Sequence, residues 1–139
     1  MKTGILVDNL SASQKAFAIL SNPNNCYVFV RDIGPICFDS QKMVSCWYDA
    51  YSFDGRIIST SLESTKFAVN LPVSKVYYYV WDLEWLRPFK NDYISNLNII
   101  HNDRVELIAR SESHKKAIEL YSNKKVSQII ENFSYEQLR

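Results

Sequence analysis

Carboxylate, amide and hydroxyl side chains follow two of the apolar runs in this chain, in positions where they could carry chemistry. Asp8 and Asn9 come directly after the first run, and Thr60 and Ser61 end a later one. A carboxylate can act as a general base or accept hydrogen bonds from ligand hydroxyls. We therefore regard Asp8 as the candidate catalytic residue and Asn9, Thr60 and Ser61 as candidate ligand contacts.

Two acids interrupt the most apolar stretch of the chain, residues 76–86. Asp82 and Glu84 are separated by one residue, so in an extended segment their side chains lie on the same side. Such a pair can hold Mg²⁺ or Mn²⁺ with a substrate phosphate. We favour instead a structural role, with the acids capping a turn or pairing with Arg87 or Arg110, because buried carboxylates need partners. Both acids are candidate ligand contacts, and no metal site is predicted.

A third group of polar residues lies in the last third of the chain. Arg110 and Ser111 follow the apolar run 105–109, and His114 lies one helical turn further on; all three are candidate ligand contacts. The chain has three glycines and contains neither a dinucleotide-binding glycine motif nor a phosphate-binding loop. The phosphates of a bound nucleotide would therefore depend on helix N-termini and Arg110. His114 belongs to no recognisable nucleophile motif, so a solvated or capping role is its default interpretation.

Ser11 and Gln14 have the spacing of a capping box, which predicts a helix beginning at Ser11. A plain helix cap explains this pair. The alternative is that Asp8, Asn9 and the open helix N-terminus form the floor of an anion or sugar site, and Ser11 is a candidate contact for that reason.

Apolar runs and turn residues predict the elements that position these groups. The residues 89–100 are ambiguous and suggest irregular structure or a short strand near 97–100. Further helices are expected at 61–69 and after residue 113. Strands are expected at residues 4–8, 26–30, 43–48, 56–60, 77–86, 105–109 and 126–130.

The alternation of strands and helices predicts an α/β fold. We expect a single Rossmann-like domain over residues 1–133, with a mostly parallel sheet and helices on both faces, and an exposed C-terminal tail over 134–139. Right-handed crossovers bring the carboxyl ends of parallel strands to one edge. The candidate residues after the strands should therefore meet at that edge.

Composition excludes several classes of protein. The net charge of +1 argues against electrostatic binding of duplex nucleic acid. Three cysteines, Cys26, Cys37 and Cys46, are odd in number and form no CxxC pair, which favours reduced thiols. No apolar run approaches the length of a signal peptide core or a membrane span. We expect a cytoplasmic protein without a membrane partner, and no cofactor is predicted.

Several segments resemble phage-encoded glycosyltransferase-like proteins. The pattern covers most of the chain and is similar to the N-terminal Rossmann-like half of two-domain (GT-B type) glycosyltransferases. The most distinctive string is YVWDLEWL at 79–86. The segments are residues 5–9 with Ser13 and Gln14, residues 53–62, residues 79–86, and residues 107–111 with His114.

The resemblance implies an acceptor-type half-site for a nucleotide sugar or glycan. Asp8 would be a base or hydroxyl ligand, and Thr60, Ser61 and Arg110 would contact the ligand. GT-B enzymes bind the sugar nucleotide mainly in a second domain, which this chain lacks, and the apolar surface left open favours a homo-oligomer or a partner protein. The chain would then pair with another chain, bind without turnover, or be a structural or regulatory remnant, in the host cytoplasm if phage-encoded.

Two other functions remain open. One is a non-enzymatic interaction protein that binds a host or virion component through its aromatic-rich edge. The other is a Mg²⁺-dependent phosphoesterase or nuclease that uses Asp8, Asp82 and Glu84.

Overall fold

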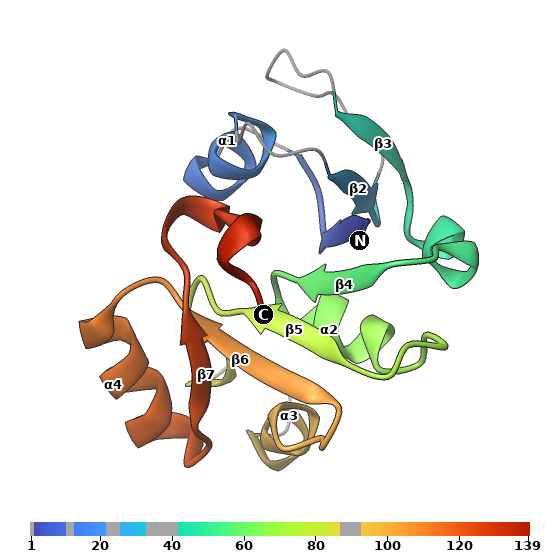
Figure 1. The fold of residues 1–139 in the computed structure, drawn as a ribbon. Helices are drawn as coiled ribbons and strands as arrows, with labels where there is room; N and C mark the ends of the chain where they lie inside the picture. The colour runs from blue at the N-terminus through green and yellow to red at the C-terminus, as the bar shows by residue number, and fades with distance from the viewer. Residues whose placement is uncertain (1, 11–12, 22–25, 33–41, 87–92) are drawn as a thin grey trace.

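A parallel sheet is the framework of the protein (Figure 1). The structure is a computed structural model that describes residues 2–10, 13–21, 26–32, 42–86 and 93–139. Within these ranges seven strands are hydrogen-bonded in the order β3-β2-β1-β4-β5-β6-β7, and every pair is parallel. The strands are β1 (Thr3–Val7), β2 (Tyr27–Val30), β3 (Met43–Cys46), β4 (Arg56–Ser59), β5 (Val76–Tyr79), β6 (Val105–Ala109) and β7 (Val126–Ile129).

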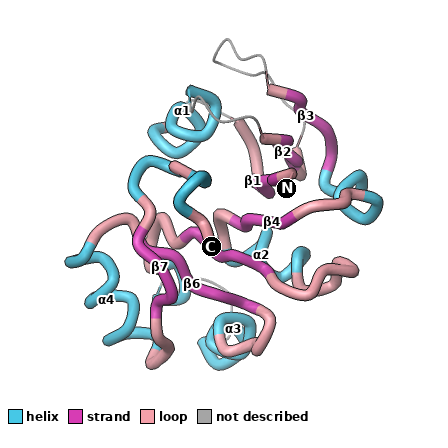
Figure 2. The backbone as a smooth tube through the Cα atoms, viewed as in Figure 1, coloured by secondary structure: helices cyan, strands magenta, loops and turns pink. Residues whose placement is uncertain are grey.

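Helices cover both faces of this sheet. One core contains side chains from α2, α3 and α4. The other contains α1 and the C-terminal turns η3 and η4, which lie beside α1 and over β5 (Figure 2). The predicted Rossmann-like α/β class is therefore confirmed. The helices are α1 (Gln14–Ser21), α2 (Leu62–Ala68), α3 (Tyr93–Ile100) and α4 (Glu112–Ser122), with 3-10 turns η1 (Trp47–Ser52), η2 (Glu84–Leu86), η3 (Glu131–Phe133) and η4 (Tyr135–Gln137).

Strand side chains alternate between the two cores. Leu6 and Tyr78 pack into the core under α2 and α3, whereas Ile5 and Tyr79 pack into the core under α1. Because both faces are covered, the central strands are largely apolar and lack the regular polar alternation of a half-exposed sheet. This is why the sequence shows them as short continuous apolar runs.

The direction in which strands are added reverses between β1 and β4. From β1 the chain moves outward to β2 and β3, and from β4 it moves the opposite way to β7. In open α/β sheets such a reversal leaves a crevice outside the carboxyl ends of the two strands, where ligands bind. Asp8 follows β1 and Thr60 follows β4, so both lie at this switch point.

The predicted strand at 77–86 is wrong in its second half. β5 ends at Tyr79, and Glu84–Leu86 forms the 3-10 turn η2. The turn forms because the Glu84 carboxylate folds back to accept a hydrogen bond from the Leu62 amide, and because Trp85 is buried. The two acids therefore do not share one side of an extended segment.

Three other element predictions need correction. Tyr93–Ile100 is a helix and contains no strand. The hydroxyl that caps α1 belongs to Ser13, which accepts a hydrogen bond from the Ala16 amide at 3.1 Å. The C-terminal tail is not exposed, since Tyr135 and Leu138 are buried in the core under α1.

No helix in the described ranges has both the length and the apolar character needed to cross a bilayer.

Candidate functional site

A hydrogen bond between Asp8 and Ser61 crosses the switch point. The Ser61 hydroxyl donates to Asp8 Oδ1 at 2.9 Å, joining the ends of β1 and β4. Asp8 is half-buried, and within the described residues its other oxygen, Oδ2, accepts no hydrogen bond. Ser61 therefore fixes the orientation of the Asp8 carboxylate through Oδ1, and Oδ2 can accept a hydrogen bond from a ligand.

The hydroxyl groups of Thr60 and Ser61, next to Asp8, form hydrogen bonds within the protein. Thr60 and Ser61 are both 1% exposed, and Thr60 Oγ1 donates to the Leu6 carbonyl at 2.7 Å. Ser61 caps α2 by accepting from the Ser64 amide, and the Ser64 hydroxyl accepts from the Thr60 and Ser61 amides. These contacts fix the backbone that holds Asp8; direct ligand contact by Thr60 or Ser61 stays a prediction.

Glu84 occupies the N-terminal end of α2. Its Oε2 accepts from the Leu62 amide at 2.6 Å and from the Tyr78 hydroxyl at 3.0 Å. Burial raises the pKa of Glu84, against the opposing effects of the Leu62 amide, Lys15 and Tyr78. The positive end of the helix is therefore already neutralised by the protein's own carboxylate.

Lys15 and Tyr78 belong to this edge but were missed by sequence reasoning. Lys15 Nζ donates to the Thr60 carbonyl at 3.3 Å, and the Tyr78 pKa lies well above its usual value because the side chain is buried and faces Glu84. Their partners lie 45 and 6 residues away, and no motif in the sequence links them.

Arg110 lies on an aromatic stack two strands away from β4. Its guanidinium carbon is 4.3 Å from the centre of the Trp81 ring. Trp81 stacks on Phe133 at 5.7 Å, and Phe133 stacks on Tyr79 at 4.1 Å. The Nε atom of Arg110 is buried without a hydrogen-bond partner. The stack fixes the guanidinium but satisfies none of its donors.

Ser111 and His114 form the start of α4. Ser111 Oγ accepts from the His114 amide at 3.2 Å, and His114 Nδ1 lies 3.4 Å from the Arg110 amide, which donates to it. Burial lowers the pKa of His114, the Arg110 charge lowers it further, and Asp82 opposes both. The structure thus supports the capping interpretation of His114 and keeps it beside Arg110.

Three candidates remain. Asn9 and Asp82 are exposed at the same edge. Ser11 lies outside the described residues. Among the described residues, no three His, Cys, Asp or Glu side chains are grouped so that they could hold a metal ion. A site made by Asp8, Asp82 and Glu84 together is therefore not formed.

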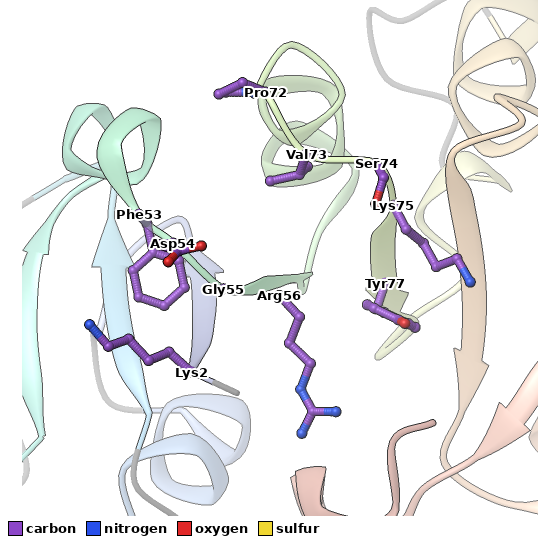
Figure 3. Close-up of a pocket in the computed structure, with 10 residues that line it drawn as sticks. All are labelled: Lys2, Phe53, Asp54, Gly55, Arg56, Pro72, Val73, Ser74, Lys75 and Tyr77. Atoms are coloured by element: carbon purple, nitrogen blue, oxygen red, sulfur yellow. The ribbon is translucent and has the colours of Figure 1, made fainter.

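A concavity lies at the opposite, amino edge of the sheet (Figure 3). Its volume is about 740 Å³, and Lys2, Arg56 and Lys75 supply its positive charge. Arg56 extends toward the C-terminal segment and donates to Thr3 Oγ1, Leu138 O and Tyr135 O, all at 2.9 Å. Lys75 is paired with Glu106 at 2.8 Å. Arg56 and Lys75 are thus engaged with the protein itself, so this concavity is the weaker candidate.

Comparison with known proteins finds no matching family model, no matching curated protein and no matching solved structure. The case for function therefore depends on the geometry of the carboxyl edge.

Proposed function

We propose that the protein binds a glycan or a nucleotide sugar at the carboxyl edge of its sheet, as a glycosyltransferase-like half. The observation that carries the proposal is the Asp8 carboxylate, held by Ser61 at the switch point with Oδ2 available to a ligand. In a Rossmann-like sheet this is the place where ligands bind.

A sugar suits this carboxylate better than a phosphate does. Sugar hydroxyls donate hydrogen bonds, and a carboxylate is an acceptor only. A phosphate beside Asp8 would meet a like charge, and the N-terminal end of α2, which Ser61 links to Asp8, is already occupied by Glu84. The glycan portion of the ligand is therefore assigned to Asp8.

Catalysis would use Asp8 as a general base. A carboxylate within hydrogen-bond reach of an acceptor hydroxyl can take its proton as the hydroxyl oxygen bonds to the anomeric carbon of the sugar donor, while the bond from that carbon to the phosphate oxygen breaks and the nucleoside diphosphate leaves. A second half would close the cleft, so we also propose that the active form is a homo-oligomer or a complex with another chain. If the chain is phage-encoded, the host cytoplasm is the proposed location.

Thermal unfolding with a panel of UDP-, GDP- and ADP-sugars and short glycans tests the proposal. A ligand at a hundred times its Kd stabilises the native state by about 2.7 kcal/mol, which raises Tm by several degrees. Asp8→Asn should remove this shift and leave the fold intact. Asp54→Asn is the matched control, because Asp54 is exposed at the amino edge. A full panel without any shift contradicts the proposal.

A non-enzymatic interaction protein is the second candidate, and one observation favours it. Tyr48 and Tyr51 are exposed, Tyr48 by 77%, and both pack edge-on against Phe67 beside the edge strand β3. Aromatic residues are enriched where protein partners bind. Capture of one stoichiometric host or virion partner, lost with Tyr48→Ala but retained with Asp8→Ala and Asp82→Ala, would support this function over the first.

A further inference from the structure

Arg110 differs from the other half-buried arginines because, among the described residues, its guanidinium contacts the Trp81 ring but has no hydrogen-bond acceptor. Arg56 and Arg104 each place their donors on three acceptors of the protein. The guanidinium of Arg110 forms no hydrogen bond and no ion pair in the described part of the chain. A buried polar atom left unpaired costs free energy, so an acceptor from outside the chain would stabilise the Nε group of Arg110.

The surroundings hold this guanidinium in a fixed place. Trp81, Phe133 and Tyr79 form a continuous stack beneath it. Phe133 is fully buried and has a left-handed backbone, φ 56°, directly after Asn132 at φ 50°. A bulky residue rarely adopts this conformation, and such strain persists where the surrounding structure imposes it. The left-handed backbone of Asn132 and Phe133 thus places the Phe133 ring in the aromatic stack under Arg110.

Among the described residues, no carboxylate accepts a hydrogen bond from the amides at the N-terminal end of α4, and the nearby Asp82 acts on His114 only through its charge. α4 has 11 residues, and its N-terminal end carries partial positive charge. At the equivalent end of α2 the protein supplies the Glu84 carboxylate. At α4 it supplies Arg110 and His114 instead, and the acid of the first turn, Glu112, is exposed. Two positive features therefore face the same place, and an anionic ligand would neutralise both.

We propose that Arg110 binds a phosphate group of the ligand at the N-terminal end of α4, so that the ligand is a phosphorylated sugar such as a nucleotide sugar. A guanidinium matches phosphate with two parallel hydrogen bonds. The choice of a sugar as the remainder of the ligand rests on the function proposed above, but the phosphate site does not depend on it.

The two ends of the ligand then lie on different strands. β1 and β6 are separated by β4 and β5, so their carboxyl ends lie about 14 Å apart at three strand spacings. A monosaccharide is too short to contact both Asp8 and Arg110. A nucleotide diphosphate sugar is long enough, with its phosphates at Arg110 and its sugar toward Asp8.

Titration calorimetry with inorganic pyrophosphate at 0.15 M salt tests the phosphate site. We expect the unaltered protein to bind pyrophosphate with a Kd below about 1 mM. Arg110→Gln should weaken this binding by about ten- to a hundredfold, the usual effect of losing charge-assisted hydrogen bonds.

Arg31→Gln is the matched control. Arg31 also lies over a tryptophan, Trp47 at 5.6 Å, but it is exposed and paired with Asp32 at 3.1 Å. Its replacement should change the Kd for pyrophosphate less than about twofold. Arg110→Lys keeps the charge but loses the planar fork, and it serves as the second variant if Arg110→Gln does not fold; it should also weaken binding.

Separate titrations with pyrophosphate, UDP and glucose distinguish the two proposals. Pyrophosphate binding that is unchanged in Arg110→Gln, or absent in the unaltered protein, overturns the phosphate site even if a glycan still binds through Asp8. Pyrophosphate and UDP binding that depends on Arg110, without any effect of a sugar or of Asp8→Asn, supports the phosphate site and contradicts the glycan function.

Discussion

Arg104 at the amino edge of the sheet and Arg110 at the carboxyl edge differ in what their guanidinium groups bind. At the amino edge, where α2 and α3 end, cations bind carbonyl oxygens of the protein: Arg104 donates to Val69 O at 2.6 Å and to Leu71 O at 2.8 Å, and Lys124 donates to Ile100 O at 2.7 Å. At the carboxyl edge, Arg110 has no such acceptor. These amino-edge cations therefore bind acceptors within the protein, whereas the guanidinium of Arg110 has no hydrogen-bond acceptor among the described residues.

Helix direction explains this difference. A parallel sheet with right-handed crossovers places helix C-termini at the amino edge and helix N-termini at the carboxyl edge. Unpaired carbonyls at a helix C-terminus attract lysine and arginine. Unpaired amides at an N-terminus attract anions, and in the described part of the chain α2 receives one, the carboxylate of Glu84.

Arg104→Ala should cause the largest loss of stability. It leaves the carbonyls of Val69, Leu71 and Val73 without their donor, and the free energy of unfolding should fall by about 3 kcal/mol or more. Urea unfolding measures this change, and ligand binding by the folded fraction should be unaffected. A loss below about 1 kcal/mol would contradict the structural role given to the amino edge.

Glu84→Ala should have an intermediate effect. The Leu62 amide and the Tyr78 hydroxyl both lose their acceptor, which should cost about 2 kcal/mol. Glu84→Gln is the matched variant, since its carbonyl oxygen can accept both bonds, and it should cost less than about 1 kcal/mol.

The pH dependence of stability separates Glu84 from other acids. Burial raises the pKa of Glu84 above its usual value of 4.5, so the folded state holds the proton at a pH where the unfolded state has released it. The contribution of this group to the free energy of unfolding is therefore largest below pH 4.5 and is lost as pH rises through the raised pKa. Urea unfolding between pH 4 and 7 should show this decline in the unaltered protein and a flatter profile in Glu84→Gln. Identical profiles would refute the assignment.

Arg110→Gln should have the smallest effect on stability. It removes only the contact with Trp81, which is worth about 1 kcal/mol or less. Circular dichroism and urea unfolding would show a native fold with nearly unchanged stability. A loss as large as that of Arg104→Ala would mean that Arg110 is a structural residue, and the contrast between the two edges would disappear.

The sequence predicts the strands better than it predicts the site. β1, β4 and β6 are short apolar runs ended by polar residues, so their positions follow from composition. β5 was extended too far because aromatic residues at 81 and 85 suit a strand as well as a buried turn. The Asp8–Ser61 bond joins residues 53 apart, and the Lys15–Thr60 bond joins residues 45 apart. Local sequence patterns do not show which distant residues pair, so the hydrogen bonds of Asp8 and Lys15 could be identified only from the three-dimensional structure.

The position of β1 also sets the order of folding. β1 pairs with β4, whose residues lie more than 50 positions away, whereas β4 to β7 pair with successive neighbours. Pairings between distant segments form late because they close long loops. We therefore expect the contact between Asp8 and Ser61 to form in the last steps of folding, when β1–β3 dock on β4–β7. A partly folded chain, in which only one of these halves is formed, would lack the proposed site.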